Sequence, residues 1–121
     1  MVRILLVSLA GLLSGCDGGA AVPADSNLVQ SLARDPEALA RGEALYLGTC
    51  AALCHGLPSD ADAFLFDCEW SHGGSDDEIF AVITNGIPDT RMVGFGNNFP
   101  EGDDDKWKII AFLRANQQPC G

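Results

Sequence analysis

The chain has 121 residues, which is enough for one small domain. Seventeen Asp and Glu residues outnumber seven Lys and Arg residues, giving a formal net charge of −10 at pH 7. This composition argues against nucleic acid as a partner, because binding a polyanion requires basic surface that displaces counterions. It fits a partner with a positive docking patch, or equally a surface charge that only keeps an exported domain soluble.

The first fifteen residues have the pattern of a targeting segment. Arg3 precedes the apolar run Ile4–Leu13, which is too short to cross a bilayer as a helix, since spanning takes about 20 apolar residues. The next residues, LSGC ending at Cys16, resemble the bacterial lipobox, in which the Cys is acylated. We therefore expect a lipoprotein signal peptide over residues 1–15 and a lipid anchor at Cys16. An ordinary secretory signal or a buried apolar segment is the alternative.

A flexible stretch follows the targeting segment. Residues 17–25 are small and mostly uncharged, which is typical of a tether. Residues 26–33 have the spacing of a short helix, because their apolar side chains fall on one side. We expect a tether over residues 16–34 and a folded domain over residues 35–121.

The first helix of this domain is expected to begin at Asp35. An Asp is a favourable N-cap, and Pro36 then occupies the first helical position, where its missing N–H carries no cost. The helix is expected to run to about Thr49. Residues 50–66 contain Gly, Pro and a polar stretch, so an irregular segment is predicted there.

Two further helices are expected. Ser75 and Glu78 have the spacing of a capping box, and Gly86 ends the helix that follows. Residues 87–100 are rich in Gly, Pro and Asn and are expected to form a loop. The last helix covers residues from about 103 to 116, with an acidic first turn that suits the helix dipole. No useful strand-like alternation occurs, so the predicted fold class is all-α.

The segment CAALCH, residues 50–55, indicates the chemistry of the chain. Two Cys followed directly by a His are typical of covalent haem attachment: each thiol adds to a haem vinyl group, and the imidazole ligates the iron. Three residues separate Cys50 from Cys54, whereas the usual number is two. Because residues i and i+4 share a helix face, a local bulge is sufficient to absorb the extra residue.

Two other interpretations of these residues stay open. Cys50, Cys54, His55 and Cys68 have the ligand types of a zinc site, although directly adjacent Cys and His are awkward for tetrahedral ligation. A disulfide between Cys50 and Cys54 is the second alternative.

The remaining cysteines form an obvious pair. Cys16 is assigned to lipid and Cys50 and Cys54 to haem, which leaves Cys68 and Cys120 of the five. An oxidising compartment favours a disulfide between them. It closes a loop of about 53 residues, for which the chain-entropy model gives on the order of 4 kcal/mol of stability.

Taken together, residues 35–118 resemble the class I cytochrome c family. The resemblance rests on Gly42 to Tyr46 ahead of CAALCH and Gly56, on NGIPDTRM at 85–92, and on DDKWKIIAFL at 104–113. It implies a class I cytochrome c fold, in which three to five helices wrap around one covalent haem c.

The resemblance also implies that Met92 is the second axial ligand of the iron, opposite His55. Its position agrees, because a Met in a Gly-rich loop has no helical face to fill. His72 competes for this place and would give a bis-His haem of lower potential. Because His72 lies in a polar segment, we expect it to be exposed and unligated. The alternative for Met92 is that it packs as loop filler. Arg91 is a candidate partner for a haem propionate, or else an exposed surface residue.

By the same resemblance, Gly42 and Tyr46 should face Ile109 and Phe112, with the Gly permitting a close helix crossing and the aromatic pair locking it. The family's Gly-Pro, whose carbonyl orients the proximal His, has no clear counterpart, and Pro58 is only a weak match. Several aromatic residues are expected to form core or haem wall: Phe64, Phe66, Phe80, Phe95 and Trp107.

The expected function is transfer of single electrons by a mono-haem carrier, not an enzyme, because two axial ligands leave no open coordination site. The predicted location is the periplasmic side of a bacterial membrane, with Asp17 resembling an inner-membrane retention signal. Residues 67–74 and Phe95-Gly96 look similar to small cytochromes that accompany periplasmic dehydrogenases, including quinoprotein dehydrogenases. The expected partners are such a dehydrogenase and a terminal oxidase or another cytochrome. A haem-based enzyme or a binder of gas or peroxide with a displaceable Met92, and a non-haem Cys/His metal protein, are the alternatives.

Overall fold

The computed structural model describes residues 24–56 and 63–121. In these residues the fold consists of α1 (Ala24–Leu32), α2 (Pro36–Leu45), η1 (Tyr46–His55), α3 (Asp76–Asn85) and α4 (Asp103–Asn116). Strand pairing in the same residues is limited to one bridge, between Gly86 and Val93. The all-α prediction is confirmed. The expected signal peptide and Cys16 lie outside the described residues.

The capping signal at the start of α2 acts as predicted. The Asp35 carboxylate accepts hydrogen bonds from the amides of Glu37 (2.9 Å) and Ala38 (3.4 Å), and α2 follows from Pro36. α1 lies within the expected tether, and its Val29 is buried in the core with only 3% of its surface exposed. This part of the tether therefore packs onto the domain. None of the helices described in the structure is both long and apolar enough to span a bilayer.

The helix that begins at Pro36 does not end near Thr49. α2 continues directly into η1, a π-helix that ends at His55. The irregular segment predicted from Cys50 onwards was wrong for residues 50–55. Gly56 is the C-cap of η1, and residues 50–55 contain neither Gly nor Pro, so no residue among them interrupts the helix.

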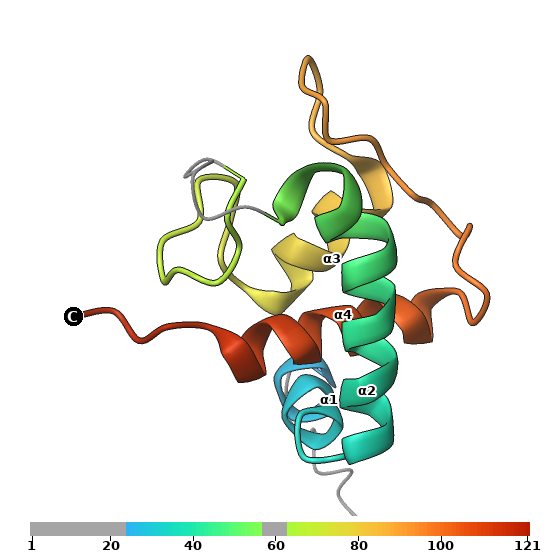
Figure 1. Cartoon of the computed structure of the whole chain (residues 1–121), viewed down its shortest axis with the longest axis vertical. Coiled ribbons are helices and arrows are strands. Elements are labelled where there is room, and N and C mark those ends of the chain that lie inside the picture. The colour runs from blue at the N-terminus through green and yellow to red at the C-terminus, as the bar shows by residue number, and fades with distance from the viewer. Residues whose placement is uncertain (1–23, 57–62) are drawn as a thin grey trace, which may run out of the picture.

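α2 and α4 cross at close range, as Figure 1 shows for the teal and red helices. A Cβ atom on Gly42 would lie 2.1 Å from the carbonyl oxygen of Lys108, so only glycine permits this approach. One turn further on, the ring of Tyr46 lies 5.5 Å from that of Phe112 and 5.2 Å from that of Phe66. The predicted pairing of Gly42 and Tyr46 with the last helix is confirmed for Phe112.

α3 and its loop complete the core. The capping box at Ser75 and Glu78 is present, and α3 ends at Gly86. Phe80 stacks on Trp107 of α4 at 4.4 Å between ring centroids. The expected core aromatics Phe66, Phe80, Phe95 and Trp107 pack against the buried cluster, to which the structure adds Phe99.

Two charged residues in the first turns of α4 are buried. Asp105 has no exposed surface, and Lys106 is 1% exposed. The Asp105 carboxylate accepts two hydrogen bonds of 2.9 Å from the guanidinium of Arg41 in α2, and one of 3.0 Å from the amide of Glu101. This bidentate pair links α2 to α4 and holds the pKa of Asp105 below its ordinary value, chiefly through the hydrogen bond from Arg41.

Candidate haem site

One cavity of about 410 Å³ brings together residues that are far apart in the sequence. Cys50, Cys54, His55 and Met92, the four residues predicted to hold haem, all line it. Much of the remaining wall is apolar, with side chains from η1, α3, α4 and the segments between them: Tyr46, Phe64, Leu65, Ile79, Val82, Ile83, Ile87, Ile109 and Leu113.

The two thiols come from the π-helix η1. In a π-helix the hydrogen bonds join residue i to i+5, and Cys50 and Cys54, with three residues between them, both line the cavity. Neither thiol is in a disulfide. Cys54 is exposed, whereas burial raises the pKa of the Cys50 thiol to about 11 and keeps it protonated at neutral pH.

His55 is held at its ring and at its backbone. The ring Nδ1 lies 2.6 Å from the carbonyl oxygen of Ala63. Because a carbonyl only accepts, Nδ1 must carry the proton, which leaves the Nε2 lone pair for a metal. The Tyr46 hydroxyl donates to the His55 carbonyl at 2.7 Å, and burial raises the pKa of this hydroxyl to about 12.

Ala63 is the functional residue that sequence reasoning missed. The sequence offers only Pro58 as a weak match to the Gly-Pro that orients the proximal His, and Pro58 lies outside the described residues. Any residue supplies a backbone carbonyl, so no side-chain pattern marks this acceptor. Only the tertiary structure places it beside the imidazole.

Met92 lies in a hydrogen-bonded loop between α3 and α4. Its carbonyl accepts from the amide of Ile87 (2.9 Å), and its amide donates to the Thr90 hydroxyl (3.1 Å). At the base of the loop, Gly86 has a φ of 71° and pairs with Val93. A Cβ atom on Gly86 would lie 2.5 Å from the Met92 carbonyl oxygen, so the glycine is required for this closure.

His72 lines the same cavity as Met92. Its side chain is exposed, as expected for the unligated state, but it lies within a segment, residues 69–73, that forms one wall. Arg91 is exposed and also lines the cavity. The structure therefore gathers both candidates for the sixth ligand around one space.

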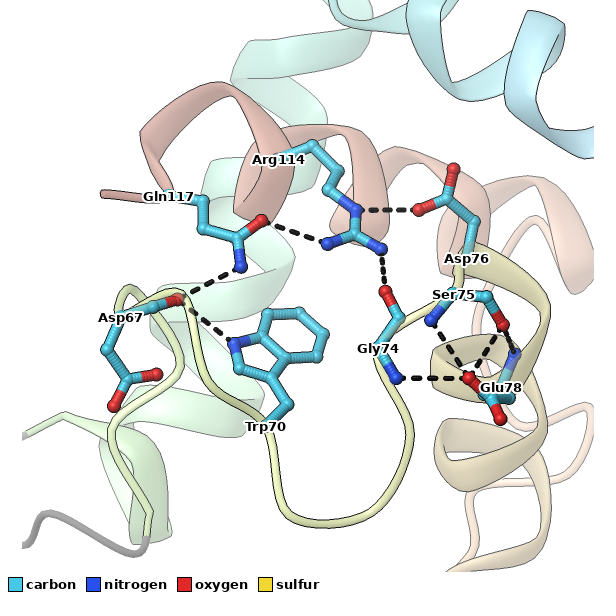
Figure 2. A network of polar contacts seen from close by, with 8 residues as sticks. All are labelled: Asp67, Trp70, Gly74, Ser75, Asp76, Glu78, Arg114 and Gln117. Atoms are coloured by element: carbon cyan, nitrogen blue, oxygen red, sulfur yellow. Dashed lines mark hydrogen bonds and ion pairs between the residues drawn. The ribbon is translucent and has the colours of Figure 1, made fainter. Parts of the chain in front are cut away.

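The wall that carries His72 is attached to the end of α4, as Figure 2 shows. The Arg114 guanidinium donates to the Asp76 carboxylate (2.6 Å), to the side-chain carbonyl of Gln117 (2.9 Å) and to the backbone carbonyl of Gly74. It also lies 5.2 Å from the centre of the Trp70 ring. One cation thus ties residues 70–76 to the last helix.

The same wall is fixed at its other end. The indole N–H of Trp70 (3.2 Å) and the Gln117 amide (3.0 Å) both donate to the Asp67 carbonyl. The structure joins the next residue, Cys68, to Cys120 through an S–S bond of 2.14 Å. Cys68 is therefore not available to the zinc site considered above. Within residues 24–56 and 63–121, no three His, Cys, Asp or Glu side chains are placed to hold a metal ion.

The residues present fit a haem of the c type. Two thiols on one helix, an imidazole with a free Nε2 and a thioether surround a space with largely apolar walls. When bound there, haem would supply an iron that cycles between two oxidation states. The polypeptide would supply the attachment through Cys50 and Cys54 and the orientation of His55.

Comparisons with known proteins point to the same chemistry. A family model described as "Cytochrome C oxidase, cbb3-type, subunit III" matches residues 37–113. The "Cbb3-type cytochrome c oxidase subunit CcoP" of Rubrivivax gelatinosus is 42% identical to this chain over 64 residues, which are 50% of the chain and 21% of that protein. The match thus covers about a fifth of the relative's length. No solved structure matches the chain.

Proposed function

The chain belongs to this family of cytochrome c domains, and on that premise we propose that it is a one-electron carrier with a single covalent haem c. Cys50 and Cys54 provide the thioether bonds, and His55 and Met92 are the axial ligands. The observation that carries the proposal is that these four residues, from η1 and from the loop after α3, line one cavity.

Met92 is the better sixth ligand of the two candidates. Its loop is fixed by the bonds of Ile87 and Thr90 to the Met92 backbone, and by the pairing at Gly86. A thioether ligand favours reduced iron and raises the potential, which suits a carrier that accepts electrons from a dehydrogenase. His72 is exposed in a wall segment, and ligation by it would require burial of the imidazole.

The ligand set favours electron transfer over catalysis at the iron. With His55 and Met92 bound, no coordination position is free for a substrate. If Met92 is easily displaced, the alternative function is a haem enzyme or a binder of gas or peroxide. Carbon monoxide added to the ferrous protein distinguishes the two, because only an accessible iron changes its spectrum.

The electron acceptor that we propose is a terminal oxidase or another cytochrome. Support comes from the name of the relative, which is a subunit of a cbb3-type oxidase. A periplasmic dehydrogenase is proposed as the donor. The net charge of −10 favours docking to a positive surface on either partner.

The proposed location is the periplasmic face of a bacterial membrane, the inner membrane by virtue of Asp17. Residues 1–15 would be removed, Cys16 would carry the lipid, and residues 16–34 would connect it to the domain at 35–121. Cys16→Ser tests this: the variant should move from the membrane fraction to the soluble fraction and lose its lipid mass. A variant that stays in the membrane fraction would reject the anchor.

The test of the haem proposal uses protein matured in a host that attaches c-type haem. Intact mass after denaturation should show one added haem, and the oxidised protein should show the absorption of a Met-ligated iron. Met92→Ala should abolish that absorption and His72→Ala should leave it unchanged. Loss of the absorption in His72→Ala alone would reverse the ligand assignment, and absence of bound mass would reject the haem.

A further inference from the structure

Lys106 is a buried charge that the proposed function does not use. Its ammonium group donates to the Thr84 hydroxyl (3.0 Å) and to the Gly96 carbonyl (3.0 Å), and forms an ion pair with the Asp103 carboxylate (2.8 Å). It also lies 4.3 Å above the centre of the Phe80 ring. An ammonium has three N–H donors, so each can have its own oxygen acceptor here. Because the side chain is only 1% exposed, the ammonium cannot bond to water instead and depends on these protein acceptors.

Two of these acceptors form the attachment point of the loop that carries Met92. At the end of the loop, the Gly96 amide donates to the Thr84 carbonyl at 2.9 Å. Lys106 adds a second connection between the same two residues, since it binds the hydroxyl of Thr84 and the carbonyl of Gly96. The Nζ atom of Lys106 in α4 is thereby bonded both to Thr84 in α3 and to Gly96 at the end of the loop.

This attachment is one of the contacts that hold the Met92 loop, together with the Gly86–Val93 bridge and the bond from the Phe95 amide to the Ile83 carbonyl (2.9 Å). The backbone bonds of Met92 to Ile87 and Thr90 fix its place within the loop. They do not fix the loop on α4. One connection to α4 close to Met92 is the bond from Lys106 to the Gly96 carbonyl; the bond from the Glu101 amide to Asp105 lies further along the loop. An apolar side chain of the same length at 106 would fill the space but leave the Gly96 carbonyl without this donor.

We propose that Lys106 is a positioning residue for the sixth axial ligand: it holds the Met92 loop closed through Gly96 and Thr84. The inference rests on the proposed ligation of iron by Met92. A competing ligand can bind the iron only in molecules whose loop is open. Its apparent affinity is therefore proportional to the fraction of open molecules. By lowering the fraction of molecules with an open loop, Lys106 lowers the apparent affinity of the iron for external ligands.

The experiment is a titration of the oxidised holoprotein with imidazole, which competes with Met92 for the iron. Lys106→Met keeps the length of the side chain and removes the charge and the donors. We expect imidazole to bind about tenfold more tightly to this variant, because the apparent affinity rises with the open fraction. The absorption of the Met-ligated iron reports the displacement directly.

Asp105→Asn is the matched control. Asp105 is the neighbouring residue and is equally buried, but its carboxylate bonds to Arg41 and to the amide of Glu101 just before α4, and not to Thr84 or Gly96. It should lower the melting temperature while changing imidazole affinity by less than about twofold, since the open fraction of the loop is unaffected. Amide hydrogen exchange gives a second readout: exchange at Gly96 should accelerate in Lys106→Met and not in Asp105→Asn.

Each outcome decides the matter. Unchanged imidazole affinity in Lys106→Met, or an equal rise in Asp105→Asn, overturns the inference and leaves the proposed function intact. A wild-type protein without Met-ligated absorption rejects both proposals. If Lys106→Met gives no holoprotein, Thr84→Val removes one acceptor of the ammonium and should show the same effect at smaller size; no effect there overturns the inference.

Discussion

The two sides of the cavity are built in different ways. On the side of His55, one continuous helical segment, α2 and η1, carries both thiols and the imidazole. α2 packs against α4, and hydrogen bonds with Tyr46 and Ala63 hold His55. On the side of Met92, a loop carries the ligand, and individual polar groups fix it. The comparison teaches that a helix itself fixes the spacing of the residues it carries, whereas a ligand on a loop depends on the hydrogen bonds at the loop ends.

Adjacent residues of α4 serve the two sides separately. Asp105 binds Arg41 of α2, and Lys106 binds Gly96 at the end of the Met92 loop. Consecutive helical positions point in directions about 100° apart, so neighbours in sequence reach different elements. This makes single substitutions able to weaken one side while sparing the other.

The largest effect is expected from Cys50→Ala combined with Cys54→Ala. Because each thiol forms one thioether bond, the double variant should keep no haem after denaturation, and each single variant should keep haem through one bond. Denaturing intact mass measures this. Cys68→Ser combined with Cys120→Ser is the control and should retain covalent haem. Full retention in the Cys50 and Cys54 double variant would place the attachment elsewhere.

The second prediction concerns the disulfide next to the cavity wall formed by residues 69–73. Removing the Cys68–Cys120 bond by Cys120→Ser should lower the free energy of unfolding by roughly 4 kcal/mol, since the bond spans 52 positions of sequence. Denaturant titration of the holoprotein measures the loss. A reducing agent should destabilise the wild type and leave a Cys68→Ser and Cys120→Ser double variant unchanged; a wild type indifferent to reduction would contradict the bond.

The packing of the His55 side is tested at Gly42. Gly42→Ala places a Cβ 2.1 Å from the Lys108 carbonyl oxygen, so α2 and α4 must separate, and we expect a loss of about 1–3 kcal/mol. Gly48→Ala in η1 is the matched control, because a Cβ there meets no atom within 4 Å beyond its own helix neighbourhood. It should be neutral or slightly stabilising. Equal melting temperatures for the two variants would show that the crossing is not tight.

The last prediction, whose effect is no larger than that at Gly42, concerns pH. The pKa of Asp105 is lower in the folded than in the unfolded protein, so its contribution is present above the unfolded value of about 4 and is lost as the pH falls through the folded value. Asp105→Asn should therefore destabilise the protein at pH 7 by about 1–3 kcal/mol, for loss of a buried charged hydrogen bond. The difference from wild type should shrink at acid pH, as measured by thermal unfolding. A difference that is constant with pH would contradict the assignment.

The sequence predicted most of the helical framework. The Asp35 N-cap with Pro36, and the capping box at Ser75, mark helix starts because they satisfy backbone amides locally. The end of the first helix could not be predicted in the same way. η1 continues through the CAALCH segment to His55 as a π-helix, and the sequence pattern carries no signal that separates this bonding from an α-helix.

The sequence by itself determined which residues are chemically suited to the site, because Cys50, Cys54 and His55 form a contiguous motif and Met92 lies in a loop free of helical packing. Only the tertiary structure decided how they meet. It placed the Ala63 carbonyl on His55, brought Met92 and His72 to one cavity, and turned Asp105 and Lys106 inward. The physical reason is that backbone carbonyls and buried ion pairs join segments distant in sequence, and no local pattern specifies their partners.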